Sequence, residues 1–236
     1  MKDIRLDKLL TTCLGLTRSK AKLLIKNKKI TVNGIVTKDV DIKISANDIV
    51  MCDGKILKYQ ENVYLMMNKP KDVICSTEDK LHKTVLNLLE GFNRNKLMIV
   101  GRLDIDTTGL LLITTDGAFV HNLTSPNKDI KKKYYVKCDN EFTDEDVKSF
   151  KEGIVINLDK EQYKCKSSTL EILDNKKEAY ITISEGKYHQ VKKMCGAVNK
   201  TVLKLKRVEI GLLKLDESLK EGEYRFLTNE EVEMFI

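Results

Sequence analysis

Apolar positions near the start of the chain recur with the period of a helix. Between Arg18 and Ile30 this spacing places three apolar side chains on one face, namely Ala21, Leu24 and Ile25. Most lysines of the stretch fall on the other faces. Thr17, directly before it, is a residue type that caps the amino end of a helix. We therefore expect an amphipathic helix with a cationic outer surface.

A β-hairpin is expected directly after this helix. Apolar residues flank Asn33-Gly34, a dipeptide that strongly favours a two-residue hairpin turn. A strand-like pattern continues to Lys58, and a polar link runs on from Tyr59. The sequence therefore predicts two domains: a small domain of helices plus a hairpin over residues 1–59, and a larger one over residues 60–236.

The larger domain consists of short apolar runs separated by turn residues and a few helical stretches. This mixture, without regular alternation of strand and helix, is typical of an α+β fold with a mixed, largely antiparallel sheet. Strands are expected at 63–68, 96–100, 110–114, 133–138, 179–184 and 205–210. Helices are expected near 84–92 and 145–154.

Composition places the chain among ordered globular proteins. Hydrophobic residues make up 42% of the 236 residues and charged residues 33%. No apolar run approaches the roughly 20 residues of a membrane span, and the start MKDIRLDKLL lacks the apolar core of a signal peptide. The 6 Cys lie far apart, and with only 3 His they suit neither a zinc cluster nor a disulfide framework. We expect a cytoplasmic monomer with reduced cysteines.

The positive charge of the chain is concentrated in its first quarter. The formal net charge is +7, and residues 1–60 carry 13 Lys and Arg against 6 Asp, so the remaining residues are balanced. An uneven distribution of this kind indicates a basic module that binds a polyanion, joined to a nearly neutral body with a different task.

One polar loop of the larger domain holds a candidate catalytic carboxylate. The segment GRLDIDTTGLLLIT starts at Gly101 and places Asp104 between two apolar strands, where the carboxylate is positioned rather than merely solvated. Asp104 or Asp106 could instead accept backbone hydrogen bonds in a turn. A metal site is disfavoured because no His lies nearby, and a glycosidase pair needs two carboxylates across a cleft.

The amino-terminal pattern resembles a known RNA-binding module. RLDKLL followed by TRSKAKLLIKNKKITVNG is similar to the S4 domain. This resemblance implies that the helix face and the hairpin turn contact structured RNA, and that phosphate contacts position the protein without reading much sequence. The contacts implied in this chain are Arg5, Arg18, Ser19, Lys20 and Lys22.

The Asp104 segment resembles the catalytic motif of the RsuA/RluB/RluE/RluF family of pseudouridine synthases, and the similarity extends over essentially the whole chain. The resemblance implies that Asp104 is the nucleophile of the isomerisation. It also implies that Arg102 belongs to the site, where a guanidinium could fill the gap left by a flipped-out uridine or pair with phosphate.

Two further segments match this family and are expected to converge on Asp104. The first is the K-x-Y motif ending at Tyr134, whose ring could stack on uracil or take part in proton transfer; Tyr135 is the alternative. The second is EGKYHQVKKM, which implies a cation that keeps Asp104 ionised. Lys192 is the preferred cation and Lys193 the alternative.

A third match opens the larger domain, where Asn68-Lys69-Pro70-Lys71-Asp72 stands in place of the family's NKPxG. Lys69 is expected to contact RNA. Asp72 replaces a glycine, so the local backbone is expected to differ, because glycine reaches conformations that aspartate reaches only at a cost. His189, in the EGKYHQVKKM segment, is expected to be a structural hydrogen-bonding residue.

Taken with the resemblance, the sequence predicts an RNA-modifying enzyme. The expected reaction is the isomerisation of a uridine in small-subunit (16S) ribosomal RNA, free or in an assembling particle, and it needs no cofactor and no metal. Two alternatives stay open: an enzyme of the same kind acting on 23S ribosomal RNA or transfer RNA, and a non-catalytic RNA-binding factor of ribosome assembly. Intact Arg102, Asp104, Tyr134 and Lys192 argue against the second alternative.

Overall fold

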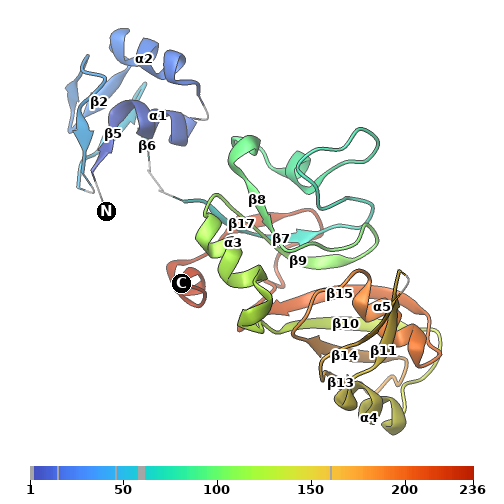
Figure 1. Ribbon diagram of the computed structural model, residues 1–236. Coiled ribbons are helices and arrows are strands. Elements are labelled where there is room, and N and C mark those ends of the chain that lie inside the picture. Colours follow the sequence, from blue (N-terminus) through green and yellow to red (C-terminus); the bar gives the residue numbers. More distant parts are fainter. Residues whose placement is uncertain (1–2, 15, 46, 58–61, 160) are drawn as a thin grey trace. The chain divides into compact units, whose positions relative to one another are not determined.

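The computed structural model describes residues 3–14, 16–45, 47–57, 62–159 and 161–236. The chain divides into two compact units, residues 1–62 with 89–96, and residues 63–88 with 97–236 (Figure 1). The domain boundary expected between residues 59 and 60 lies outside the described residues. None of the helices in the described ranges is long and apolar enough to cross a membrane.

The first unit packs two helices against short strands. Its described helices are α1 (Leu6–Leu14) and α2 (Arg18–Lys26). Its described strands are β1 (Ile4–Arg5), β2 (Ile30–Val32), β3 (Ile35–Val36), β4 (Lys43–Ile44), β5 (Val50–Cys52) and β6 (Lys55–Leu57). β1 pairs with β4, and the other four form an antiparallel sheet in the order β3-β2-β5-β6.

The expected helix and hairpin of this unit are confirmed. Thr17 caps α2, since its side chain accepts a hydrogen bond from the Lys20 backbone N–H. Ala21 and Ile25 are buried in the core of the unit, with Leu24 packed against it. Asn33 and Gly34 join β2 to β3 with φ of 52° and 81°, the left-handed conformations that a two-residue hairpin turn needs.

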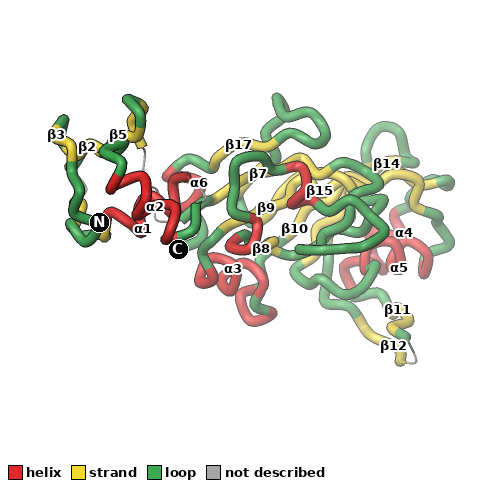
Figure 2. The backbone as a smooth tube through the Cα atoms, turned by 90° about the horizontal axis from the view of Figure 1, so that it is seen from above, coloured by secondary structure: helices red, strands yellow, loops and turns green. Residues whose placement is uncertain are grey.

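The second unit is built on a nine-stranded sheet. The sheet is mixed and largely antiparallel, as the sequence predicted, and its strands are yellow in Figure 2. Its order is β13-β14-β10-β15-β9-β7-β17, with β8 on β9 and β16 on β15, and β11 and β12 form a separate hairpin. The strands are β7 (Tyr64–Lys69), β8 (Met98–Val100), β9 (Thr108–Thr114), β10 (Lys132–Cys138), β11 (Val155–Leu158), β12 (Glu161–Lys164), β13 (Thr169–Ile172), β14 (Glu178–Ile183), β15 (Val202–Ile210), β16 (Leu213–Lys214) and β17 (Tyr224–Phe226).

Helices cover the two halves of this sheet separately. The α-helices are α3 (Gly117–Thr124), α4 (Asp144–Glu152), α5 (Gln190–Ala197) and α6 (Asn229–Glu233). Contacts place α3 beside β8 and β9, whereas α4 lies against β13 and α5 against β11 and β15. The chain also has short 3-10 helices, η1 (Val85–Leu88), η2 (Arg94–Lys96) and η3 (Pro126–Lys128).

The two expected helices of this unit had different outcomes. α4 is present, and Thr143 and Asp146 form a reciprocal capping box at its start. The prediction of a helix near 84–92 is wrong, because this segment forms a single 3-10 turn, η1, and no α-helix. The Asn87 side chain accepts hydrogen bonds from the backbone and hydroxyl of Thr84, and Gly91 has a φ of 77°, so the local hydrogen bonds compete with a longer helix.

A short parallel contact joins the two halves of the sheet. β9 and β15 pair over only two positions, Thr108 with Lys206 and Gly109 with Arg207, whereas every other strand pair of the sheet is antiparallel. One hydrophobic core lies among β10, β13, β14, α4 and α5, and another among β7, β9 and α3. Gly109, with a φ of 101°, occupies the point where the halves meet.

We predict that Gly109→Ala lowers the free energy of unfolding by about 3 kcal/mol. An added Cβ would lie 2.2 Å from the backbone oxygen of Arg207, so the strands would have to separate. The matched control is Gly117→Ala at the start of α3, whose nearest neighbour would be a methionine methyl at 4.0 Å. Denaturant titration of both variants is the measurement, and equal stability would show that the contact between the strands is not required.

Candidate active site

The polar loop predicted to hold the nucleophile connects β8 to β9. Gly101 turns the chain out of β8 with a φ of 70°. Leu103 then anchors the loop in the core and donates its backbone N–H to the sulfur of Cys75 at 3.4 Å. Asp104 follows, and its carbonyl accepts a hydrogen bond from the Thr107 N–H at 3.1 Å, which closes a tight turn. The backbone on both sides of the carboxylate is therefore fixed.

The last residue of β7 holds this loop from the inside. The buried Lys69 ammonium donates to the carbonyl oxygens of Pro70 at 2.9 Å, Thr107 at 3.0 Å and Ile105 at 3.4 Å. The expected RNA contact at Lys69 is therefore wrong: its side chain has no exposed surface and is used to brace the loop. Burial lowers the pKa of Lys69.

Asp72 supports the same loop through its backbone. Its N–H donates to the Ile105 carbonyl at 2.9 Å, and its φ is 62°, in the left-handed region. Aspartate is among the few residue types that adopt this conformation at modest cost. The residue that replaces the family glycine thus keeps a conformation suited to glycine.

Asp104 shares one cation with Asp106. Lys192, in the first turn of α5, lies 2.9 Å from Asp104 Oδ2 and 2.5 Å from Asp106 Oδ1. Burial disfavours the charged ammonium, but the hydrogen bonds and charges of both aspartates raise the pKa of Lys192 overall. The Lys193 side chain instead lies over the Tyr188 ring at 5.2 Å. Of the two lysines considered from the sequence, Lys192 is the one beside Asp104.

The two aspartates of the loop face different spaces. Asp104 lines a cavity of about 510 Å³ together with Tyr134 and Arg102. Asp106 instead lines a separate recess with Lys71 and Lys192. Only Asp104 of this pair can therefore reach a base held in the larger cavity.

Tyr134 reaches this cavity because of the direction of its strand. It is 7% exposed and pairs with Arg207 of β15, at a point where the register of the two strands shifts. Tyr135 points to the opposite face. There the centroid of its ring lies 6.2 Å from the centroid of the Tyr180 ring. Burial, followed by a hydrogen bond to Glu178, raises the pKa of Tyr135 to about 12.

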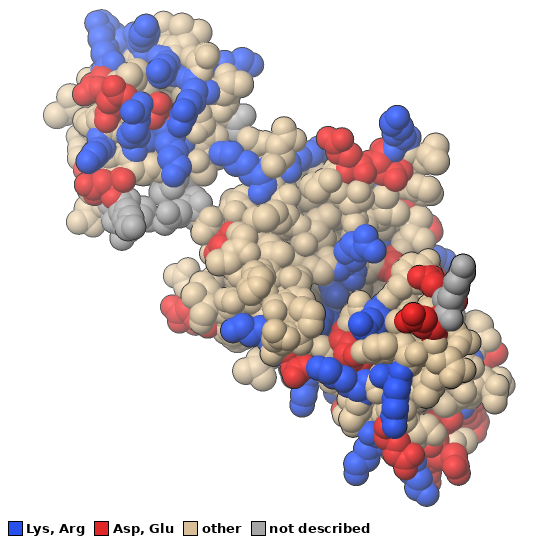
Figure 3. All heavy atoms as spheres, viewed as in Figure 1, with Lys and Arg blue, Asp and Glu red and all other residues tan. Residues whose placement is uncertain are grey.

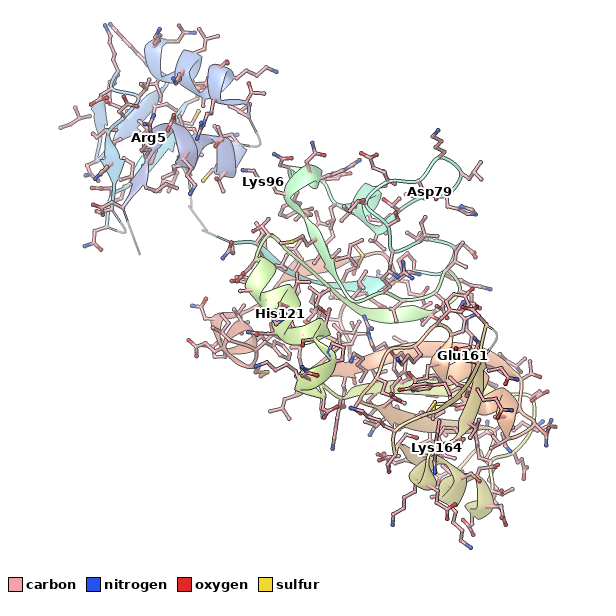
Figure 4. The ribbon with its side chains drawn as sticks, viewed as in Figure 1. Arg5, Asp79, Lys96, His121, Glu161 and Lys164 are labelled. Carbon is pink, nitrogen blue, oxygen red and sulfur yellow. The ribbon has the colours of Figure 1, made fainter. Side chains whose placement is uncertain are left out.

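The segment before α5 closes one side of the cavity. Glu185 accepts hydrogen bonds from the Tyr163 hydroxyl, the Lys166 N–H and the Gln190 amide. Tyr163 comes from β12, whose ends Glu161 and Lys164 are labelled in Figure 4. Sequence reasoning missed Tyr163, because its role depends on a hairpin that does not pair with the main sheet.

His189 lies closer to the carboxylate than its expected structural role implied. Its Nε2 is 3.6 Å from Asp104 Oδ1, which is too long for a hydrogen bond. Its ring stacks on Tyr188 with centroids 3.8 Å apart, and its φ of 53° places it in the left-handed region. Tyr188 is 61% exposed and lines the cavity, so the stacked pair forms an aromatic rim.

The residues expected to contact RNA in the first unit lie on exposed positions. Arg18, Ser19, Lys20 and Lys22 are all exposed on α2. Figure 3 shows Lys and Arg side chains gathered on the visible face of this unit. Arg5, which is labelled in Figure 4, is half exposed, but its guanidinium is already bound to Asp7 and Asp41.

Comparison with known proteins gives concordant matches. Residues 63–197 match the RNA pseudouridylate synthase family, and residues 4–50 match the S4 domain. A Vibrio cholerae protein named ribosomal small subunit pseudouridine synthase A is 41% identical over 97% of this chain and 98% of its own length. The Escherichia coli protein of that name is 40% identical over 97% of this chain and 98% of its own length. A crystal structure of a pseudouridylate synthase covers 99% of this chain and all of its own, with 39% identity and a TM-score of 0.70.

We predict that Lys69→Met lowers the free energy of unfolding by about 1–3 kcal/mol, because it leaves buried carbonyl oxygens without a donor. The matched control is Lys71→Met, two residues along the same segment, where the side chain is exposed and the change should stay within about 0.5 kcal/mol. Thermal or denaturant unfolding measures both. A Lys69→Met protein as stable as the control would show that the brace contributes nothing.

Proposed function

The chain belongs to the RNA pseudouridylate synthase family, and on that premise we propose that it isomerises a uridine of small-subunit ribosomal RNA with Asp104 as the nucleophile. The observation that carries the proposal is the placement of one carboxylate: Asp104 faces the cavity, lies beside Tyr134 and is ion-paired with Lys192 at 2.9 Å. A carboxylate held beside a cation in this way is available to add to an electrophilic carbon.

The reaction balances without a co-reactant. The N1–C1′ bond of uridine breaks, the uracil turns within the cavity, and a C5–C1′ bond forms. C5 loses a proton and N1 gains one, so there is no net oxidation or group transfer. Asp104 acts by adding to C1′ or to C6, or by stabilising a glycal, and in each case its anion is required. The target base must first leave the RNA stack to reach Asp104.

The surrounding residues have separate roles in this proposal. Tyr134 provides a ring wall for the uracil and a phenol near the site of proton transfer. Lys192 holds the Asp104 carboxylate and compensates its charge. Arg102 is exposed at the edge of the cavity, where a guanidinium can fill the place of the flipped base or pair with phosphate.

Small-subunit RNA is the proposed target because the full-length relatives carry that name. Pseudouridine mapping in ribosomal RNA from cells with and without the gene tests this choice. A missing pseudouridine in 23S ribosomal RNA or transfer RNA would redirect the proposal to that substrate. We further propose that the enzyme is a cytoplasmic monomer, and that residues 1–59 bind RNA while residues 60–236 carry the chemistry.

We predict that Asp104→Asn abolishes pseudouridine formation while the protein stays folded and binds RNA. The substitution keeps the size and the hydrogen-bonding groups but removes the nucleophilic anion. Tritium release from C5-labelled uridine in small-subunit RNA measures the reaction, and a melting curve checks the fold. Substantial release by a well-folded Asp104→Asn protein would contradict the proposed mechanism.

Asp106→Asn is the matched variant in the same loop. It removes the other carboxylate that holds Lys192, so we expect a partial loss of activity from a less fixed ammonium. Asp104 still faces the cavity in this variant. An equal and complete loss in both variants would leave the nucleophile unassigned between the two aspartates.

We also predict that Lys20→Gln combined with Lys22→Gln weakens RNA binding and lowers its salt dependence, while the rate at saturating RNA is kept. Each phosphate contact that is lost should lower the slope of log affinity against log salt by about 0.7 to 0.9. The control removes two exposed lysines of α4, Lys148→Gln with Lys151→Gln. Equal slopes in both double variants would rule out α2 as the RNA-binding face.

A further inference from the structure

The cavity beside Asp104 contains a buried guanidinium that the proposed chemistry does not use. Arg207 lies on β15, is 2% exposed and lines the cavity. Its Nε donates to the Leu110 carbonyl at 2.8 Å, but Nη2 has no hydrogen-bond partner among the described residues. A charged donor taken out of water without an acceptor is strongly destabilising. Arg207 therefore places an unsatisfied donor in the wall of the cavity.

Lys132 adds a second cation to the same wall. It lines the cavity two residues before Tyr134 on β10, and Tyr134 is the cross-strand partner of Arg207. The half-buried Lys132 ammonium donates to the Ile130 carbonyl at 2.9 Å, and no carboxylate in the described ranges forms an ion pair with it. Burial and then the nearby charge of Arg207 lower the pKa of Lys132. Arg207 and Lys132 together are called the cationic wall below.

Several other charges of the cavity are matched within the chain, whereas the cations Arg102 and Lys187 are exposed at its edge. Asp104 is paired with Lys192, and Glu185 accepts its three hydrogen bonds from neighbours. Lys166 forms an ion pair with Asp129 at 2.6 Å. The cationic wall thus remains the buried and uncompensated part of this surface, and Figure 3 shows Lys and Arg atoms inside a hollow of the second unit.

We propose that Arg207 and Lys132 bind one phosphodiester of the target RNA strand, next to the uridine that enters the cavity. A planar guanidinium with a free N–H, beside an ammonium, matches the singly charged oxygens of a phosphodiester. A flipped nucleotide brings its own 5′ and 3′ phosphates with it, so the anion reaches the cavity together with the base. The proposal rests on the proposed function, which supplies the target RNA as its ligand. It is tested by measuring RNA binding rather than turnover.

The test combines substitutions of the cationic wall with neutral RNA linkages. Target RNA fragments carry a single uncharged methylphosphonate on the 5′ or the 3′ side of the target uridine. For wild-type protein we expect one of the two positions to weaken binding about tenfold and to lower the salt slope by about 0.7, the value for one phosphate contact on a single strand. For Lys132→Gln we expect weaker binding of the natural RNA and little further effect of that linkage.

The control variant is Lys133→Gln, the next residue of β10, whose ammonium pairs with Glu171 at 2.9 Å and does not line the cavity. It should keep the full wild-type response to the neutral linkage. Arg207→Lys keeps a buried cation but loses the planar fork, so it should show a reduced response, with melting curves confirming the fold. Because Lys132→Gln leaves Arg207 and its bond to Leu110 in place, the test does not depend on the Arg207 variant folding.

The same linkage effect in wild type, Lys132→Gln and Arg207→Lys would overturn the proposal, since the wall would then not contact that phosphate. No linkage effect, together with inorganic phosphate raising the melting temperature of wild type but not of Lys132→Gln, would assign the wall to a free phosphate and overturn the RNA assignment. Tritium release by the wild-type preparation tests the proposed function separately, so failure of one proposal is distinguishable from failure of the other.

Discussion

The close approach of β9 to β15 is the constraint on which the second unit depends. Only two residue pairs join the strands, and they do so because position 109 carries no side chain. The hydrophobic cores also meet at this junction, because Ile210 of β15 lies in the core beside β9 and Leu103 lies in the core beside β10. The junction brings together polar side chains from both halves as well: Asp104 comes from the loop that enters β9, while Tyr134 and Arg207 come from β10 and β15.

Charge pairing orients the two carboxylates of the loop at this junction. The ammonium of Lys192 lies between two carboxylates of one turn, so ion pairs join the loop to α5 in addition to the apolar core that contains Leu103 and Val191. One carboxylate faces the large cavity and the other a separate recess. An ion pair that is only partly buried adds little stability in general, so its value here lies in orientation.

Much of this could be predicted from the sequence, because local patterns carry it. The Thr17 cap, the Asn33-Gly34 turn and the mixed sheet all follow from periodicity and turn chemistry. The burial of Lys69 and the free nitrogen of Arg207 could not be predicted in this way. A lysine after an apolar strand reads as a surface residue, and an arginine in LKRVEI reads as an outward position, until the neighbouring strands are placed. Long-range contacts decide both cases.

The brace at Lys69 also bears on how such a site changes over evolutionary time. Its ammonium donates hydrogen bonds to main-chain oxygens of the loop and to no side chain. These hydrogen bonds therefore do not depend directly on which side chains occupy positions 105 and 107. The Ile105 side chain is 39% exposed, and its replacement leaves the hydrogen bond to the carbonyl of position 105 intact. Sequence change at position 105 can therefore alter the outer surface of the loop while the backbone that carries Asp104 stays in place. The hydrogen bonds that position the nucleophile are thus independent of the surface that the loop presents to solvent.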